Sequence, residues 1–402
     1  MVMRVNQLRK NTLDEIQLAR AFAILAVLAV HGSSSGVTNV EPDSVLFPIY
    51  NFLNIAGKLG TPTFIMLSSF VLFYNYYPRE TNWGLMKRFY GKRLKFILIP
   101  YFVFSLLYFV IKMVVYYDYP SISFAINRFI TLLALGKAHT HLYFVFISVQ
   151  FYLLFPLFLI AFKKLTFLRK HAIWIGLLLQ WGWVILNNNY FHIPWKGSIS
   201  LSYLSFYFMG AFLGIYYNDL KAKWKQPLFK ERIIIPLTLG YGIMVFLYTG
   251  YMYLSRIGVF TTIGNYLPGF VSSYIGEFTW ATHALFAGVF LFYLAHLANQ
   301  TFQLRTKMVF MEIGATSFGI YLIHPLFLMV FRQLVNSGSP IIYHGWQVIT
   351  FILVGLLSWL AVRVTYRFIP FYWVLFGKMN LQKLFKIPKQ KGSNIHEYQN
   401  YS

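Results

Sequence analysis

Two polar residues, Arg20 and His31, interrupt the first long apolar run of the chain, which extends from 16 to 37. Arginine is a permanent cation whose fork of donors suits phosphate or carboxylate, and histidine can act as a general base near neutral pH. On a helix, the eleven-residue spacing places both side chains on one face, about 16.5 Å apart along the axis. Ionisable residues in membrane helices usually face protein or a water-filled cavity. The pair therefore predicts a polar site inside a helical bundle.

Each member of the pair also has a simpler interpretation. Arg20 lies about two turns from the start of the apolar run, so its side chain could instead extend to lipid phosphates. His31 could be a neutral histidine bonded to a backbone carbonyl. The shared helix face favours a site.

Basic residues gather before the third apolar run, where Arg88, Lys92 and Arg93 occur within six positions. Such residues are typical topology determinants at a cytoplasmic membrane boundary. They could also form a phosphate-binding rim, because guanidinium groups match the geometry of a nucleotide diphosphate.

Further polar residues lie in or near later apolar runs. His139 and His141 precede a helix that carries Gln150 and Tyr152, and surface histidines at the outer membrane boundary are one interpretation. Two histidines two positions apart diverge by about 200° on a helix, so no metal site is expected. His324 lies near mid-membrane beside Pro325, which indicates either a functional residue or a structural polar network.

The second apolar run is interrupted at 57–62, where two glycines, a lysine and a proline occur together. Such a break leaves backbone groups that must face protein or water. The sequence leaves open whether this is a plain proline kink or a break that lines a substrate site.

The elements that would position these residues are membrane helices. The chain has 402 residues, of which 58% are hydrophobic and 20% aromatic, with a mean hydropathy of +0.56. This composition excludes an ordinary soluble domain and predicts an all-α polytopic membrane protein of about ten transmembrane helices. The expected spans are 15–36, 46–76, 95–117, 140–162, 172–190, 199–217, 233–254, 278–298, 312–334 and 346–376.

The net charge of +24 does not indicate nucleic-acid binding, because the basic residues are concentrated in alternate loops. By the positive-inside rule this register places both termini in the cytoplasm. Glu15 and Glu312 are expected near helix starts, where the helix dipole favours acidic residues. The absence of cysteine excludes disulfides and thiolate chemistry.

The chain divides into a cytoplasmic N-terminus at 1–13, a transmembrane domain at 14–376 and a basic cytoplasmic tail at 377–402. No cleavable signal peptide is expected, since the first apolar run is too long.

An ordered series of motifs resembles the membrane acyltransferase 3 family. It comprises the Arg20 and His31 pair followed by segments at 61–68, 93–101, 141–156, 206–214 and 317–325. The resemblance covers about 14–376. Two departures are Tyr143, where the family often has tryptophan, and Gln17, where an aspartate is common.

The resemblance implies a multi-pass enzyme of the cell membrane, in a bacterial plasma membrane, that uses acyl-CoA as co-substrate and no metal. It would transfer an acetyl or succinyl group to a hydroxyl of an extracytoplasmic polysaccharide or envelope glycan, as proposed for stand-alone intercellular adhesin proteins. His31 matches the catalytic histidine, Arg20 its partner arginine and Arg93 the basic motif, with Arg88 and Lys92 beside it. His141, Gln150, Tyr152 and His324 would bind substrate or form a polar network.

Two other functions remain open from the residues. The chain could export a polysaccharide or lipid-linked sugar, with the broken second helix and His324 lining the path. It could also be a non-catalytic subunit of polysaccharide synthase machinery.

Overall fold

The computed structural model describes residues 13–117, 119–224, 226–260, 269–335, 339–379 and 381, with side chains from 274 onward in the helix that begins at 269. The long helices are α1 (Asp14–Asn39), α3 (Gly60–Tyr76), α4 (Trp83–Tyr116), α6 (Tyr143–Lys164), α12 (Ile235–Arg256), α14 (Gly269–Thr301), α15 (Leu304–Leu334) and α16 (Pro340–Phe368). The shorter α-helices are α2 (Phe47–Ala56), α5 (Ile122–Ala134), α7 (Thr166–Lys170), α8 (Ala172–Leu186), α9 (Leu204–Ile215), α10 (Tyr217–Lys223), α11 (Pro227–Phe229) and α17 (Tyr372–Phe376). Single helical turns are η2 (Gly57–Leu59), η3 (Asn187–Phe191), η4 (Lys196–Ser198), η5 (Ser200–Tyr203) and η6 (Lys230–Ile234). The prediction of an all-α polytopic membrane protein is confirmed.

Eight helical segments in the described part of the chain are long and apolar enough to cross a membrane. The spans expected at 172–190 and 199–217 are not among these eight. Their positions hold the 15-residue α8 followed by η3, and η5 followed by the 12-residue α9. Helix α9 packs between α3 and α8, and nearly all of its residues are buried. Because it faces protein rather than lipid, it does not need the length of a lipid-facing span.

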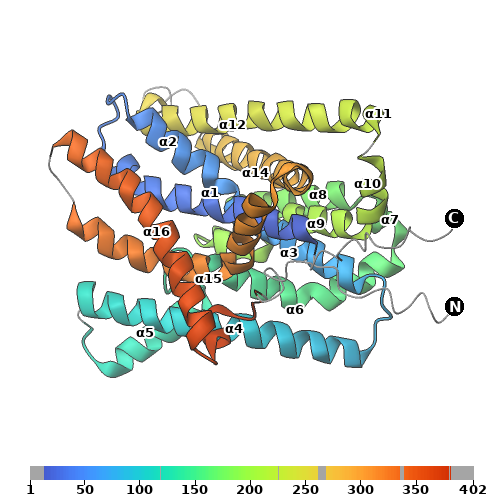
Figure 1. The fold of residues 1–402 in the computed structure, drawn as a ribbon, viewed down its shortest axis with the longest axis horizontal. Coiled ribbons are helices and arrows are strands. Elements are labelled where there is room, and N and C mark those ends of the chain that lie inside the picture. The colour runs from blue at the N-terminus through green and yellow to red at the C-terminus, as the bar shows by residue number, and fades with distance from the viewer. Residues whose placement is uncertain are drawn as a thin grey trace, which may run out of the picture.

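Helix α1, which carries Arg20 and His31, runs through the middle of the bundle (Figure 1). It packs against α2, α3, α14, α15 and α16. A helix surrounded on so many sides has little lipid contact, so its polar residues face neighbouring helices. This arrangement fits the polar site expected from the sequence.

Small residues allow the helices that carry the site to approach closely. A Cβ atom at Gly314 of α15 would overlap the backbone carbonyl of Gln17 on α1. A Cβ at Gly210 of α9 would likewise overlap the carbonyl of Met66 on α3. Membrane helices commonly pack through such residues, since there is little hydrophobic force between helices in lipid.

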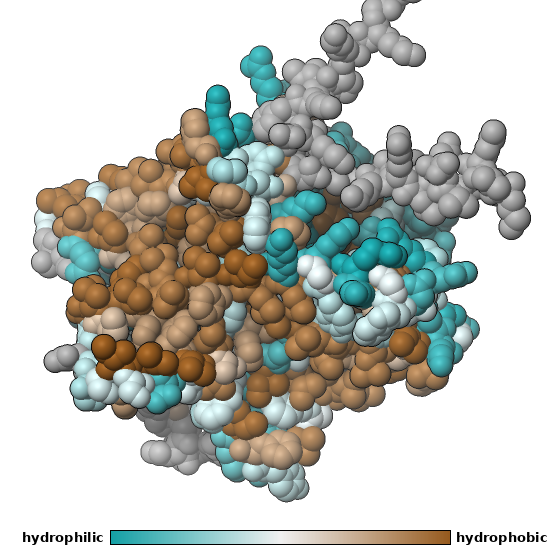
Figure 2. Space-filling view, turned by 90° about the horizontal axis from the view of Figure 1, so that it is seen from below, coloured by the Kyte–Doolittle hydropathy of each residue, from teal (hydrophilic) through white to brown (hydrophobic). Residues whose placement is uncertain are grey.

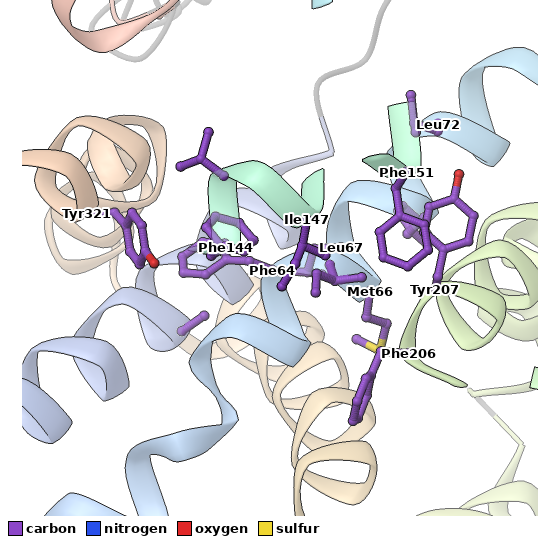
Figure 3. Close-up of a cluster of buried hydrophobic side chains, with 14 of the residues drawn as sticks. Phe64, Met66, Leu67, Leu72, Phe144, Ile147, Phe151, Phe206, Tyr207 and Tyr321 are labelled. Carbon is purple, nitrogen blue, oxygen red and sulfur yellow. The ribbon is translucent and has the colours of Figure 1, made fainter. Parts of the chain in front are cut away.

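Aromatic packing fills the interior beside these contacts. Figure 3 shows the side chains of Phe151 and Tyr207 lying face to face, with ring centroids 4.2 Å apart and planes 7° apart. Phe144 on α6 reaches the ring of Tyr321 on α15, 5.1 Å away. These contacts hold α6 against α9 at one place and against α15 at another.

The outer surface has the hydropathy of a membrane protein. Hydrophobic side chains cover most of the face seen in Figure 2, and hydrophilic ones gather toward the ends of the bundle. Helices α4, α12 and α16 expose many large apolar residues, including Leu106, Phe246 and Leu356. These surfaces fit contact with lipid tails.

Acidic residues at the start of α1 form ion pairs with later helices. Asp14 binds Lys307 at 2.9 Å, and the buried Glu15 binds Lys221 at 3.2 Å. The expectation for Glu312 is wrong, because α15 begins at Leu304, and Glu312 is buried two turns inside the helix. It pairs with Arg363 and accepts a hydrogen bond from Trp359 Nε1 at 3.0 Å. Glu312 therefore joins α15 to α16.

Candidate active site

The break in the second apolar run lines a cavity of about 990 Å³. Helix α2 ends at Ala56, the turn η2 covers 57–59, and α3 begins at Gly60 with Pro62 in its first turn. Gly57, Lys58, Gly60, Thr61 and Pro62 all contribute to the cavity wall. This geometry favours the substrate-lining interpretation of the break over a plain proline kink.

His31 lies half-buried on the wall of the same cavity. Its ring nitrogens have no hydrogen-bond partner among the described residues, so the expected alternative of a histidine satisfied by a backbone carbonyl does not apply. Its own carbonyl oxygen accepts a hydrogen bond from Arg332 Nη2 at 2.6 Å. Arg332 thus anchors this turn of α1 to α15, while the His31 imidazole stays available to a ligand.

His324 supports His31 from α15. The His324 side chain is fully buried, and its ring centroid lies 5.0 Å from that of His31. Nδ1 lies 2.8 Å from the carbonyl oxygen of Tyr321, and a carbonyl can only accept, so Nδ1 carries the proton. Nε2 then holds a lone pair and has no hydrogen-bond partner in the described part of the chain. His324 is therefore arranged to accept a hydrogen bond beside His31.

His141 and His139 extend the cluster from the loop between α5 and α6. The interpretation of a surface histidine is wrong for His141, which is 1% exposed because α15 covers it; Tyr321 donates a hydrogen bond to its carbonyl. Its ring lies 5.6 Å from that of His324, and its Nδ1 is 2.8 Å from Nδ1 of His139. The two histidines are not on a helix, so the expected divergence does not hold.

Burial lowers the pKa of His139 to about 3, and the positive charge of Lys112 acts in the same direction, as do His31 and Arg332. His139 is therefore neutral throughout the physiological pH range. Within the described residues, no group of three or more His, Asp or Glu side chains could hold a metal ion.

This arrangement suits general-base chemistry. A sugar hydroxyl is a poor nucleophile at neutral pH and needs a neighbouring base with a free lone pair. His31 can supply that lone pair to a ligand in the cavity. The His324 ring lies 5.0 Å away, centroid to centroid, and places a second imidazole beside the candidate base.

Arg20 lies in a different environment at the other end of α1. Its half-buried side chain is within electrostatic reach of Arg93 and Tyr152. Arg93 stacks over the Tyr152 ring at 5.6 Å, and the Tyr152 hydroxyl is 3.0 Å from Ser68 Oγ. Two neighbouring guanidinium groups repel one another unless an anion lies between or beside them. The structure thus brings Arg20, Arg93 and Tyr152 together in a group separate from the histidines.

Arg88 and Lys92 remain apart from that group. Both are exposed on α4, and neither forms an ion pair among the described residues. Helix α4 has 34 residues and is about 51 Å long, which exceeds the roughly 30 Å hydrocarbon core of a bilayer. Its first turns can therefore extend beyond the membrane, where Arg88 and Lys92 could meet a soluble anion.

Gln150 has a structural place instead. Its Nε2 donates to the carbonyl of Ser198 at 2.8 Å, and its Oε1 accepts from the backbone N–H of Ser200 at 2.9 Å. Both ends of the amide are therefore occupied in joining α6 to the turns η4 and η5. Of the two roles expected for Gln150, the polar-network role fits this geometry.

Arg332 was not predicted to be a site residue, and Lys58 was noted only as part of the break at 57–62. The sequence does contain a signal for each of them, because both are basic residues inside apolar runs, as Arg20 is. Arg332 lies eight residues after His324, which places it about 80° around the same helix. The contact between Arg332 and His31 could not be predicted from the sequence, because the two residues are 301 positions apart and lie on different helices.

Comparison with known proteins identifies the family. A family model described as an acyltransferase domain matches residues 13–376, which is most of the chain. No curated protein and no solved structure matched the chain. The matched residues include the histidines of the site, His31, His139, His141 and His324, and also Arg20, Arg93 and Tyr152. The chain therefore belongs to the acyltransferase 3 family and is a membrane acyltransferase.

Proposed function

We propose that the protein transfers an acetyl or succinyl group from cytoplasmic acyl-CoA to a hydroxyl of an extracytoplasmic polysaccharide or envelope glycan. The observation that carries the proposal is the position of His31. Among the described residues the His31 imidazole has no hydrogen-bond partner. It lines a large cavity, and the ring of His324 lies beside it. The family supports acyl transfer in general, whereas the donor and acceptor belong to the proposal.

The basic loops support the proposed orientation, in which both termini are cytoplasmic and the protein lies in a bacterial plasma membrane. The cluster of Arg20, Arg93 and Tyr152 then lies toward the cytoplasm, where acyl-CoA is found. The cavity lies toward the outside, where the glycan is found. Arg20 and Arg93 would bind donor phosphates or pantetheine, and Arg88 and Lys92 would attract the nucleotide at the membrane surface.

In the proposed reaction, His31 takes the proton from the acceptor hydroxyl as its oxygen attacks the thioester carbon. The carbon–sulfur bond then breaks, and the released CoA thiolate takes a proton from the imidazolium. His324 Nε2 would accept a hydrogen bond from His31 and hold its ring in place. The distance of about 16.5 Å between Arg20 and His31 along α1 must be spanned by the pantetheine arm of the donor.

The proposal is tested by mass spectrometry of surface glycans from cells with the gene intact, deleted or carrying His31→Ala. The matched control is His171→Ala, which removes an exposed histidine outside the site. We expect a mass increment with the intact gene and the control, and its loss in the other two strains. The size of the mass increment would identify the acyl group, and the glycan that carries the increment would be identified as the acceptor.

Transport is separated from transfer in proteoliposomes that contain the purified protein. Acyl-CoA should be consumed only when a glycan acceptor is present, and no glycan should cross the membrane without a donor. Flux of glycan in the absence of any acyl donor would contradict the proposal and favour an exporter. An effect on glycan output only together with a synthase, without binding of acyl-CoA, would favour a non-catalytic subunit.

A further inference from the structure

We propose that the cavity contains a carboxylate-binding subsite built around Lys58, so that the acyltransferase selects a substrate carrying a negative charge near the reacting hydroxyl. This inference rests on the proposed function, because it specifies the substrate of the same cavity. The carboxylate can come from an acidic sugar of the acceptor or from a dicarboxylic acyl group.

Lys58 is the central observation. It is the middle residue of η2, at the break between α2 and α3, and its half-buried side chain faces the cavity. Among the described residues it has no hydrogen-bond or ion-pair partner. A lysine inside a membrane bundle usually pairs with an anion or a carbonyl, because desolvation of its charge is costly. Lys58 is thus a cation that a ligand could neutralise.

The neighbourhood of Lys58 adds positive charge rather than compensating it. Arg256 of α12 lies within electrostatic reach. Its guanidinium is held by two neutral amides, with Nη1 2.8 Å from Asn51 Oδ1 and Nη2 2.8 Å from Asn54 Oδ1. These bonds satisfy the geometry of the guanidinium without cancelling its charge.

Three more cations line the cavity. Lys112 Nζ donates to the carbonyl of Ala138 at 3.1 Å, Lys137 lies 4.6 Å from the centroid of the Trp195 ring, and Arg128 is exposed. No aspartate or glutamate is found among the described residues of this wall. Glu277, near Tyr203, is engaged by Lys196 at 3.0 Å, and Asp118 lies outside the described residues. The cavity therefore carries excess positive charge.

The rest of the wall suits a carbohydrate and a short acyl chain. Tyr143, Trp195, Tyr203 and Trp280 present aromatic rings to the cavity. Aromatic side chains supply apolar faces with polar edges, which can pack against a sugar ring. Cations beside such faces would recognise a sugar or acyl group that bears a carboxylate, and would favour it over a neutral analogue through charge-assisted hydrogen bonds.

The charge of the cavity can be measured without acyl transfer, because the chain contains no cysteine. We would introduce Thr140→Cys, which lines the cavity, and compare its rates of reaction with an anionic and a cationic methanethiosulfonate reagent. Val45→Cys is the matched control, since it is 88% exposed, outside the cavity wall and close to Glu41 and Asp43. Both variants would be tested as full chains in native membranes.

We expect the ratio of anionic to cationic rates to be about tenfold higher at position 140 than at position 45. Adding Lys58→Gln should lower that ratio severalfold, and Lys112→Gln provides a second neutralising variant in case the first does not fold. Equal ratios at the two positions, or a ratio unchanged by both neutralising substitutions, would overturn the proposal.

Protection of the cysteine at position 140 distinguishes the two sources of the carboxylate. Slower labelling with methyl glucuronide than with methyl glucoside would assign the charge to the acceptor. Slower labelling with succinyl-CoA than with acetyl-CoA would assign it to the acyl group. Equal effects of the charged and neutral members of both pairs would overturn carboxylate recognition. Loss of the proposed acyltransferase function would instead appear as an absence of acyl transfer with the charge preference intact.

Discussion

Two buried histidines of this protein, His324 and His296, differ in how their nitrogens are used. His296 lies near the start of α1, where its Nε2 is 3.0 Å from the Tyr217 hydroxyl and its Nδ1 is 2.8 Å from the Phe292 carbonyl. His324 uses only Nδ1, and its Nε2 has no hydrogen-bond partner within the residues that the structure describes. A fully bonded histidine stabilises packing, whereas one with a free lone pair can accept a proton or a hydrogen bond.

A free lone pair is not sufficient to indicate a site. His283 is fully buried, and neither of its ring nitrogens has a hydrogen-bond partner among the described residues. It nevertheless packs against Tyr241 and Tyr248 and is not part of the cavity wall. His324 differs because it touches His31, which does line the cavity. His324 therefore fits the proposed active site on two grounds, its unpartnered nitrogen and its contact with a residue that lines the cavity, whereas His283 meets only the first.

Among the substitutions that test this difference between His324 and His296, His324→Gln should have the largest effect on acyl transfer. It should lower the rate of acyl transfer by about 100-fold or more, because His31 would lose the imidazole proposed to hold its ring during the reaction. The apparent Tm should fall less than in the variant of His296, because His324 bonds through Nδ1 alone. His296→Gln should do the reverse, with a lower Tm, since hydrogen bonds to buried partners are lost, and with transfer retained. A thermal-unfolding assay and a transfer assay on both variants check this, and an exchange of the two outcomes would refute it.

An effect of intermediate size is expected for Arg93→Ala at the donor end. Loss of a charge-assisted contact to a donor phosphate should raise KM for acyl-CoA by about 10-fold to 100-fold, with a smaller change in kcat. Arg88→Ala is the matched control on the same helix, and its exposed side chain should give a smaller rise. Steady-state kinetics with varied acyl-CoA measure both values. An equal rise in KM in the two variants would show that Arg93, which is half-buried beside Arg20, binds the donor no better than the exposed Arg88.

The smallest effect concerns pH. The pKa of His139 is lowered from 6.5 to about 3, chiefly by burial. Above pH 6.5, His139 is neutral in both the folded and the unfolded chain, so it makes no pH-dependent contribution. Between pH 6.5 and about 3 the unfolded chain binds the proton first, so the free energy of unfolding falls as the pH falls.

Thermal unfolding in detergent between pH 8 and pH 5 should therefore show a declining Tm in the lower part of the range. His139→Gln should make that decline shallower. The exposed His171→Gln should leave it unchanged. An identical decline in all three proteins would show that His139 does not contribute.

Periodicity and charge predicted the parts of the fold that depend on local sequence. The shared face of Arg20 and His31 required only the helical repeat, and the break at 57–62 was visible from its glycines and proline. Apolar helices were expected where α8 and α9 lie, but as full membrane spans. The shortness of α9 was not foreseen, because it follows from packing against α3 and α8. The contacts of His324 with His31 and of Arg332 with the His31 carbonyl depend on how α15 lies against α1. Such tertiary contacts leave no periodic signal in the sequence.

The central claim is that Arg20 and His31 serve opposite ends of one site along α1. It is tested most directly by measuring acyl-CoA binding and acyl transfer with purified Arg20→Gln and His31→Gln. We predict that His31→Gln binds acyl-CoA with unchanged affinity but loses transfer by about 10²-fold to 10⁴-fold, and that Arg20→Gln weakens acyl-CoA binding. Retained transfer in His31→Gln, or an equal loss of donor binding in both variants, would contradict the claim.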